Sequence, residues 1–160
     1  MSCRFRAASG TVEFTDSVLA LFRRHRQRHF WSCEAGGQLF FRPDESVFRV
    51  GLATGPGRHD RCSPFSFWPN RAREQQDIQR FFPQGLHYIG DWHSHPEDNP
   101  SPSDTDINKM LAIFRESDHQ LPFMLLVVVG RSSDSGGLWV GTVNREGVAE
   151  ATAISGCGSA

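Results

Sequence analysis

The sequence predicts one α/β domain in which a central mixed sheet is flanked by helices. The chain has 160 residues, the length of one ordinary domain. Its hydrophobic content of 38%, with 13 Phe and 4 Trp, is enough to fill one sizeable core. Segments with strand-like patterns alternate with segments of helical period, which favours helices on both faces of a sheet. We expect a single domain over residues 1–160, whose last six residues, "SGCGSA", form a flexible tail.

In the first half of the chain, "TVEF" predicts a first strand, and Thr15 is expected to cap a helix that runs to about residue 29. "EAGGQLFF" and "ESVFRVGLA" predict two paired strands joined around Pro43 and Asp44. The segment Gly55–Asn70 is rich in Pro, Gly and aromatic residues and predicts a loop. This loop either covers the core or lies beside a binding cleft, and the pattern favours neither.

In the second half, Asn70 is expected to cap a helix that ends near Phe82, and "LHYIGDWH" predicts a strand. Ser103 opens a third helix, "SDTDINKMLAIFRES". "PFMLLVVVG" is a continuous apolar run of strand length, which indicates a strand buried on both faces. "GLWVGTV" and "GVAEATAI" complete the predicted sheet.

Charge and cysteine content limit the classes of partner and compartment. The formal net charge is −1, which gives no indication of a nucleic-acid or membrane partner. The four cysteines, at positions 3, 33, 62 and 157, form no CxxC pair, so we expect neither a disulfide framework nor a cysteine-based zinc finger. The start of the chain lacks an apolar stretch typical of a signal peptide, and we expect a cytoplasmic, reduced protein.

The stretch "GDWHSHPEDNPSPSDTD" carries the candidate metal ligands. Residues two apart in a strand project to the same face, so His93 and His95 point together. Pro96 ends the strand, and Asp106 lies in the first turn of the next helix, from which it can reach the histidines. Two imidazoles and one carboxylate leave a fourth tetrahedral position open for water, as catalytic zinc sites do.

Each part of this pattern also has a simpler explanation. A lone His-x-His is often a polar strand end, and Ser103-x-x-Asp106 is also a helix capping box. Asp98 and Asp104 are competing carboxylates, although each fits a solvated charge better. The conjunction of both motifs favours the metal site. Cys33 could in principle be a thiol nucleophile, but its position predicts no neighbouring histidine, which disfavours a cysteine peptidase.

The run His93-Ser94-His95-Pro96, followed by Ser103 and Asp106, resembles the motif of the JAMM (JAB/MPN) metallopeptidases, whose fold is cytidine-deaminase-like. That family also has a glutamate before a strand that begins near a glycine pair, and Glu34 in "CEAGGQLFF" matches it. The resemblance extends from "TVEFTDSVLALF" to the strand after the third helix. It is strongest to the bacterial JAB peptidases of CBASS anti-phage operons.

The resemblance implies a role for each matching residue. His93, His95 and Asp106 are expected to bind Zn²⁺, Glu34 to act as the proton acceptor, and Ser103 to donate a hydrogen bond to the oxyanion. Considered without the family, Glu34 fits an exposed charge at a strand start and Ser103 a simple N-cap. Trp92 is expected in the core, and Ser94 is expected to face away from the metal without a catalytic role.

The implied function is a zinc isopeptidase acting at the C-terminal tail of a ubiquitin-like-conjugated protein. In CBASS, that protein is a cGAS-like nucleotidyltransferase, and the enzyme separates it from its attached target. Alternatives are a peptidase that processes a sulfur-carrier protein, a RadC-like JAB protein and a non-catalytic MPN scaffold. Ser94 in place of Asn disfavours the RadC-like branch, and five filled functional positions disfavour the scaffold. A zinc-dependent nucleic-acid enzyme is disfavoured by the near-zero charge.

Overall fold

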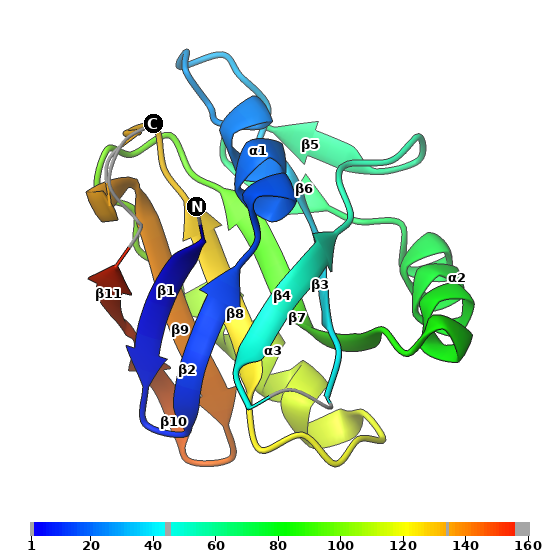
Figure 1. Ribbon diagram of the computed structural model, residues 1–160. Coiled ribbons are helices and arrows are strands. Elements are labelled where there is room, and N and C mark those ends of the chain that lie inside the picture. The colour runs from blue at the N-terminus through cyan, green and yellow to red at the C-terminus, as the bar shows by residue number, and fades with distance from the viewer. Residues whose placement is uncertain (1, 44–45, 134, 156–160) are drawn as a thin grey trace.

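A nine-stranded mixed sheet forms the centre of the computed structural model, which describes residues 2–43, 46–133 and 135–155 (Figure 1). The strands are β1 (Cys3–Ala7), β2 (Gly10–Phe14), β3 (Gly36–Phe41), β4 (Phe48–Ala53), β5 (Arg61–Ser63), β6 (Ser66–Trp68), β7 (His87–Ser94), β8 (Met124–Val129), β9 (Leu138–Asn144), β10 (Gly147–Glu150) and β11 (Thr152–Ser155). The helices are α1 (Asp16–Arg24), α2 (Arg71–Phe81) and α3 (Asp104–Glu116), with 3-10 turns at Phe82–Gln84 and Ser135–Gly137.

The main sheet has the order β10-β9-β8-β7-β3-β4-β2-β1-β11, and β5 and β6 form a separate two-stranded sheet. Strands β7 and β8 are parallel, as are β2 and β4, whereas the other neighbours are antiparallel. The prediction of a mixed sheet flanked by helices is therefore confirmed. Figure 1 shows α1 and α3 on opposite faces of this sheet.

Strand β8 is buried along its whole length, as its uninterrupted apolar sequence predicted. Leu125, Val127 and Val129 belong to the core that includes α1, whereas Met124 and Leu126 pack with residues of α3. Alternation of side chains along the strand thus supplies both cores at once. Burial of each such side chain stabilises the fold by roughly 1.5–3 kcal/mol.

Several local predictions need correction. The first helix ends at Arg24 rather than near residue 29, because Gln27 leaves the helix and becomes fully buried, donating hydrogen bonds to the carbonyls of Ser32 and Pro64. Strand β1 precedes the predicted first strand. The segment Gly55–Asn70, predicted as a loop, contains the β5–β6 hairpin.

The C-terminal strands also differ from the prediction. "GVAEATAI" supplies two strands that lie at opposite edges of the sheet, β10 beside β9 and β11 beside β1. Ala151 between them is buried, and its N–H donates to the carbonyl of Val140. Of the predicted flexible tail, Ser155 belongs to β11 and residues 156–160 lie outside the described residues.

The expectation of reduced cysteines is also wrong, since Cys33 and Cys62 form a disulfide. The hairpin folds back over the start of β3 and brings the two Cα atoms to 5.5 Å, although 29 residues separate them in sequence. Sequence spacing alone could not indicate this proximity. None of the helices in the described part of the chain has the length and apolar character that a membrane crossing requires.

Gly37 occupies a position in β3 where no side chain fits. A Cβ atom built there would lie 1.9 Å from the carbonyl oxygen of Thr54, an atom that also accepts the indole N–H of Trp92 at 2.8 Å. We therefore expect Gly37→Ala to destabilise the protein by about 1–3 kcal/mol, because backbone must move to relieve the contact. Urea unfolding measures this change.

Gly51 in β4 provides a matched control, since a Cβ atom there meets no atom within 4 Å. Gly51→Ala should change the free energy of unfolding by less than about 0.5 kcal/mol. Equal stability of the two variants would contradict the close packing of β3 against Thr54.

Candidate metal centre and active site

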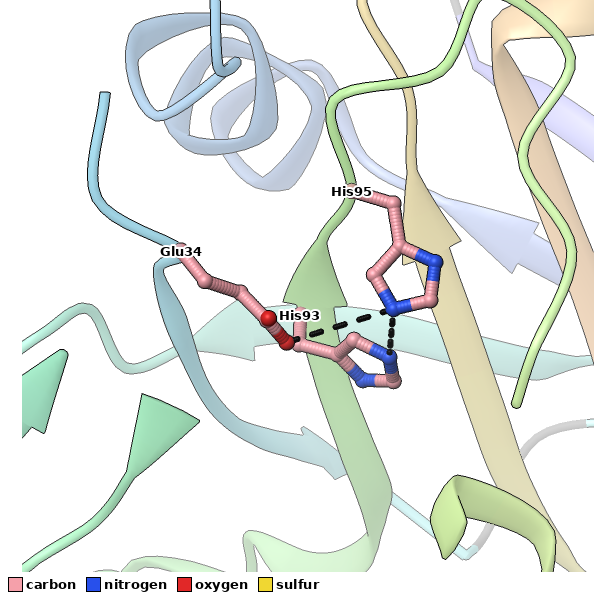
Figure 2. A group of neighbouring side chains, drawn as sticks. All are labelled: Glu34, His93 and His95. Atoms are coloured by element: carbon pink, nitrogen blue, oxygen red, sulfur yellow. Dashed lines mark hydrogen bonds and ion pairs between the residues drawn. The ribbon is translucent and has the colours of Figure 1, made fainter. Parts of the chain in front are cut away.

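His93 and His95 lie at the carboxyl end of β7 and share one face of the sheet. Their Nε2 atoms are 3.1 Å apart, and Figure 2 shows both rings turned toward the same point. Strand β7 ends at Ser94, yet the N–H of His95 still donates to the carbonyl of Val129 at 2.9 Å. The pairing with β8 therefore continues one residue past the strand and holds the second histidine.

Asp106 reaches the histidines from the first turn of α3. Its Oδ2 lies 3.1 Å from His93 Nε2 and 3.4 Å from His95 Nε2. The same oxygen accepts the N–H of Ser103 at 2.8 Å, and Ser103 Oγ accepts the N–H of Asp106 at 3.1 Å. The capping box and the candidate ligand are thus one arrangement, in which helix capping aims the carboxylate.

Glu34 lies in the segment just before β3 and is held by neighbours on both sides. Its N–H donates to the carbonyl of Ser63 in the hairpin at 2.8 Å. The following residue, Ala35, donates its N–H to Ser94 Oγ and accepts the N–H of Ser94. Glu34, a residue only 6% exposed, consequently places its carboxylate Oε1 4.0 Å from His95 Nε2 (Figure 2).

Burial and neighbouring charge set the ionisation of these groups. Burial raises the pKa of Glu34 to about 7, although the charge of His95 partly opposes this. Burial alone would also raise the pKa of Asp106, but contacts with His93 and His95 outweigh it and hold that pKa far below its usual range. Burial would lower the pKa of His95, but Asp106 raises it overall.

The spacing of the donor atoms fits a small tetrahedral cation. Ligands at zinc–ligand distances of 2.0–2.1 Å lie about 3.3–3.4 Å from one another in a tetrahedral site. The three distances among His93 Nε2, His95 Nε2 and Asp106 Oδ2 are 3.1, 3.1 and 3.4 Å. Glu34, His93 and His95 also form a group whose possible ligand atoms lie within 4.8 Å of one another. Two imidazoles and a carboxylate are ligands that zinc prefers.

A cavity of about 630 Å³ opens beside this centre. Its walls come from the hairpin, the start of α2, the end of β7 and α3, and they include Glu34, Phe67, Asp91, Ser103, Lys109 and Met110. All five residues predicted for the site line this cavity, namely Glu34, His93, His95, Ser103 and Asp106. Their individual roles stay predictions.

The sequence did not reveal how Ser94 and Lys109 contribute. Ser94 is fully buried and donates to Gln27 Oε1, so it links the segment before Glu34 to the end of β7. Its spacing from the histidines correctly placed it off the metal face but concealed this positioning contact. Lys109 follows Asp106 by one helical turn, and its Nζ lies 3.9 Å from Asp91 Oδ2. Helical spacing from Asp106 was the available signal for Lys109.

The comparison with known families agrees with this architecture. Residues 15–140 match the prokaryotic homologues of the JAB domain. The chain belongs to this family. The resemblance found in the metal motif and around Glu34 is thereby confirmed at the level of the family. In the solved structures, a protein of Desulfitobacterium hafniense has the same fold, with a TM-score of 0.59, 21% identity, and coverage of 86% of this chain and 87% of that one.

Two curated relatives extend the comparison over most of the chain. A protein of Vibrio cholerae is 41% identical over 132 residues, covering 81% of this chain and 80% of the relative. A protein of Pseudomonas aeruginosa is 32% identical over 125 residues, covering 76% of this chain and 78% of the relative. Both relatives are named CD-NTase/cGAS isopeptidase.

We expect His95→Ala to abolish tight zinc binding, because it removes one of three predicted ligands at the centre. Purified wild-type protein should contain close to one zinc per chain by elemental analysis, and the variant should lose most of it. His59→Ala is a suitable control, since His59 is exposed and distant in sequence from the motif. Full zinc retention by His95→Ala would show that the ligand assignment is wrong.

Proton competition should make zinc binding sensitive to pH. The pKa of His95 is raised above 6.5, the pKa of an ordinary histidine. The His95 ring therefore stays protonated to a higher pH than an ordinary histidine ring does. Zinc affinity should therefore fall as pH decreases through that raised pKa. NMR titration of the metal-free protein should give a midpoint above 6.5 for His95, and a lower midpoint in Asp106→Asn. A His95 midpoint below 6.5 would contradict the effect of Asp106.

Proposed function

We propose that this protein is a zinc-dependent isopeptidase that separates the C-terminal tail of a conjugated protein from a lysine amine of its target. The observation that carries the proposal is the convergence of His93, His95 and Asp106 on one point, with the buried Glu34 carboxylate 4.0 Å from His95. The names of the two relatives support a cGAS-like nucleotidyltransferase as the conjugated protein. Anti-phage defence in the cytoplasm is the setting that we propose.

In this mechanism, His93, His95 and Asp106 hold the metal. When bound, zinc supplies Lewis acidity, which polarises the scissile carbonyl and lowers the pKa of water. Glu34 accepts a proton from the attacking water and delivers it to the leaving amine, a task that its pKa near 7 suits. Ser103 Oγ accepts the Asp106 N–H, so its hydroxyl proton remains available to donate to the developing oxyanion.

The cavity suits an extended polypeptide tail. The hairpin contributes Phe65, Phe67 and Trp68 to one wall, which offers apolar contact to tail side chains. Extended peptides commonly bind alongside strands, where the backbone supplies affinity and pockets supply specificity. We infer that several residues before the cleaved bond are recognised, whereas the amine side makes fewer contacts.

We expect Glu34→Gln to retain zinc while cleaving roughly 10²–10⁴-fold more slowly, because the amide cannot accept a proton. The substrate for this assay is a candidate nucleotidyltransferase tail joined to a lysine of an unrelated protein. Glu116→Gln, at the exposed end of α3, is the matched control and should cleave normally. A strong chelator should abolish cleavage by the wild type.

Near-normal turnover by Glu34→Gln would mean that Glu34 is a structural residue only. Cleavage that resists the chelator would contradict a metal-dependent reaction. Failure of the wild type to cleave any tail conjugate would overturn the proposed substrate class.

A further inference from the structure

The β5–β6 hairpin is a small element that the main sheet does not stabilise directly. Each of its strands has three residues, and they pair only with one another among the described strands. Isolated two-stranded hairpins are marginally stable in water. The hairpin nevertheless forms a wall of the cavity beside the metal centre. Its position must therefore depend on the contacts that join it to the rest of the fold.

Several of these contacts reach the segment that carries Glu34, while Asp60 at the base of the hairpin is bonded to Asn70 and Arg73. The Ser63 carbonyl accepts the Glu34 N–H, and the Pro64 carbonyl accepts a hydrogen bond from the Gln27 side chain at 2.9 Å. The ring of Phe67 lies against Gly36, where a built Cβ atom would come within 2.7 Å of it. The covalent connection is the Cys33–Cys62 disulfide, which joins the residue before Glu34 to the middle of β5.

The disulfide is also accessible, because both Cys33 and Cys62 are exposed. Exposed disulfides react readily by thiol–disulfide exchange, and in reducing compartments such bonds are commonly transient and redox-sensing. We propose that the Cys33–Cys62 disulfide is a redox-sensitive clamp that fixes the hairpin wall of the cavity and so controls substrate binding. This inference rests on the proposed isopeptidase function for its effect on activity.

A dithiol reductant can carry out the switching reaction by thiol–disulfide exchange. One thiolate of the dithiol attacks a sulfur of the Cys33–Cys62 bond, which breaks and gives a mixed disulfide and one cysteine thiolate. The second thiol of the reductant then displaces the other cysteine. Two electrons and two protons pass to the protein, which gains two thiols, while the reductant becomes a disulfide.

The clamp should affect substrate binding more than the chemical step. Glu34 should keep its position after reduction, because the next residue, Ala35, stays hydrogen-bonded to Ser94 on the side away from the hairpin. The hairpin loses its disulfide cross-link to the segment before β3 and is docked for a smaller fraction of the time. If that fraction falls to about one tenth, the apparent affinity for the tail falls roughly tenfold.

The test compares oxidised and reduced wild-type holoenzyme, using a water-soluble trialkylphosphine because dithiols bind zinc. Hydrogen exchange followed by mass spectrometry should show faster exchange in residues 61–68 after reduction. In the cleavage assay, KM should rise roughly tenfold with a smaller change in kcat. The double variant Cys33→Ser with Cys62→Ser should match the reduced wild type under both conditions.

Unchanged hairpin exchange and unchanged KM after reduction would overturn the clamp, as would a double variant that behaves like the oxidised wild type. If the double variant responded to the reductant as strongly as the wild type, the effect would come from other cysteines, and the clamp proposal would be overturned. Faster hairpin exchange with no cleavage in either state would retain the clamp as a conformational device and contradict the isopeptidase function instead.

Discussion

The geometry of the site depends on the pairing of Ala35 with Ser94. The N–H of Ala35 donates to Ser94 Oγ at 2.9 Å, and the N–H of Ser94 donates to the carbonyl of Ala35 at 2.8 Å. These bonds join the segment carrying Glu34 to the residue between the two histidines. Ser94 is fully buried, so loss of its hydroxyl would leave polar groups without partners inside the protein. A small hydroxyl therefore positions the candidate base relative to the candidate ligands.

Ser103 and Asp106 at the start of α3 both cap the helix and position a candidate metal ligand. The capping box of α3 satisfies the N–H groups of Ser103 and Asp106, and it simultaneously orients the Asp106 carboxylate toward the imidazoles. Glu34 and Asp106 are both acidic and lie around one pair of histidines, so part of the raised pKa of Glu34 comes from the Asp106 charge. A bound cation would relieve this repulsion, which couples metal binding to the stability of the fold.

The β5–β6 hairpin contributes an aromatic wall to the cavity beside the candidate metal centre. It brings Phe65, Phe67 and Trp68 to a cavity whose other walls come from the sheet, from α2 and α3, and from the segment after β7. Phe65 is 83% exposed and Trp68 is 55% exposed, an arrangement that suits contact with a partner polypeptide more than core packing. The short segment between Cys33 and Gly36 joins the hairpin to the candidate metal centre, and the Gln27 side chain, bonded to both Pro64 and Ser94, provides a second link.

Local sequence determined the main helices and strands and the short-range contacts within them. The apolar run of β8 specified a strand buried on both faces, and Asn70 and Ser103 correctly marked the starts of α2 and α3. The proximity of His93 and His95 follows from strand alternation, and the Ser103–Asp106 capping box follows from the position of both residues at the start of α3. These features depend on residues a few positions apart, where backbone geometry alone sets the distances.

Tertiary structure decided the contacts between distant segments. Glu34 reaches His95 because β3 pairs with β7. Its place at a strand start favoured an exposed charge, so the family resemblance rather than the local pattern identified it. The Cys33–Cys62 bond, the β5–β6 hairpin and the separation of β10 from β11 were likewise invisible in the sequence. Such contacts arise from the packing of whole elements, which local propensity and spacing do not encode.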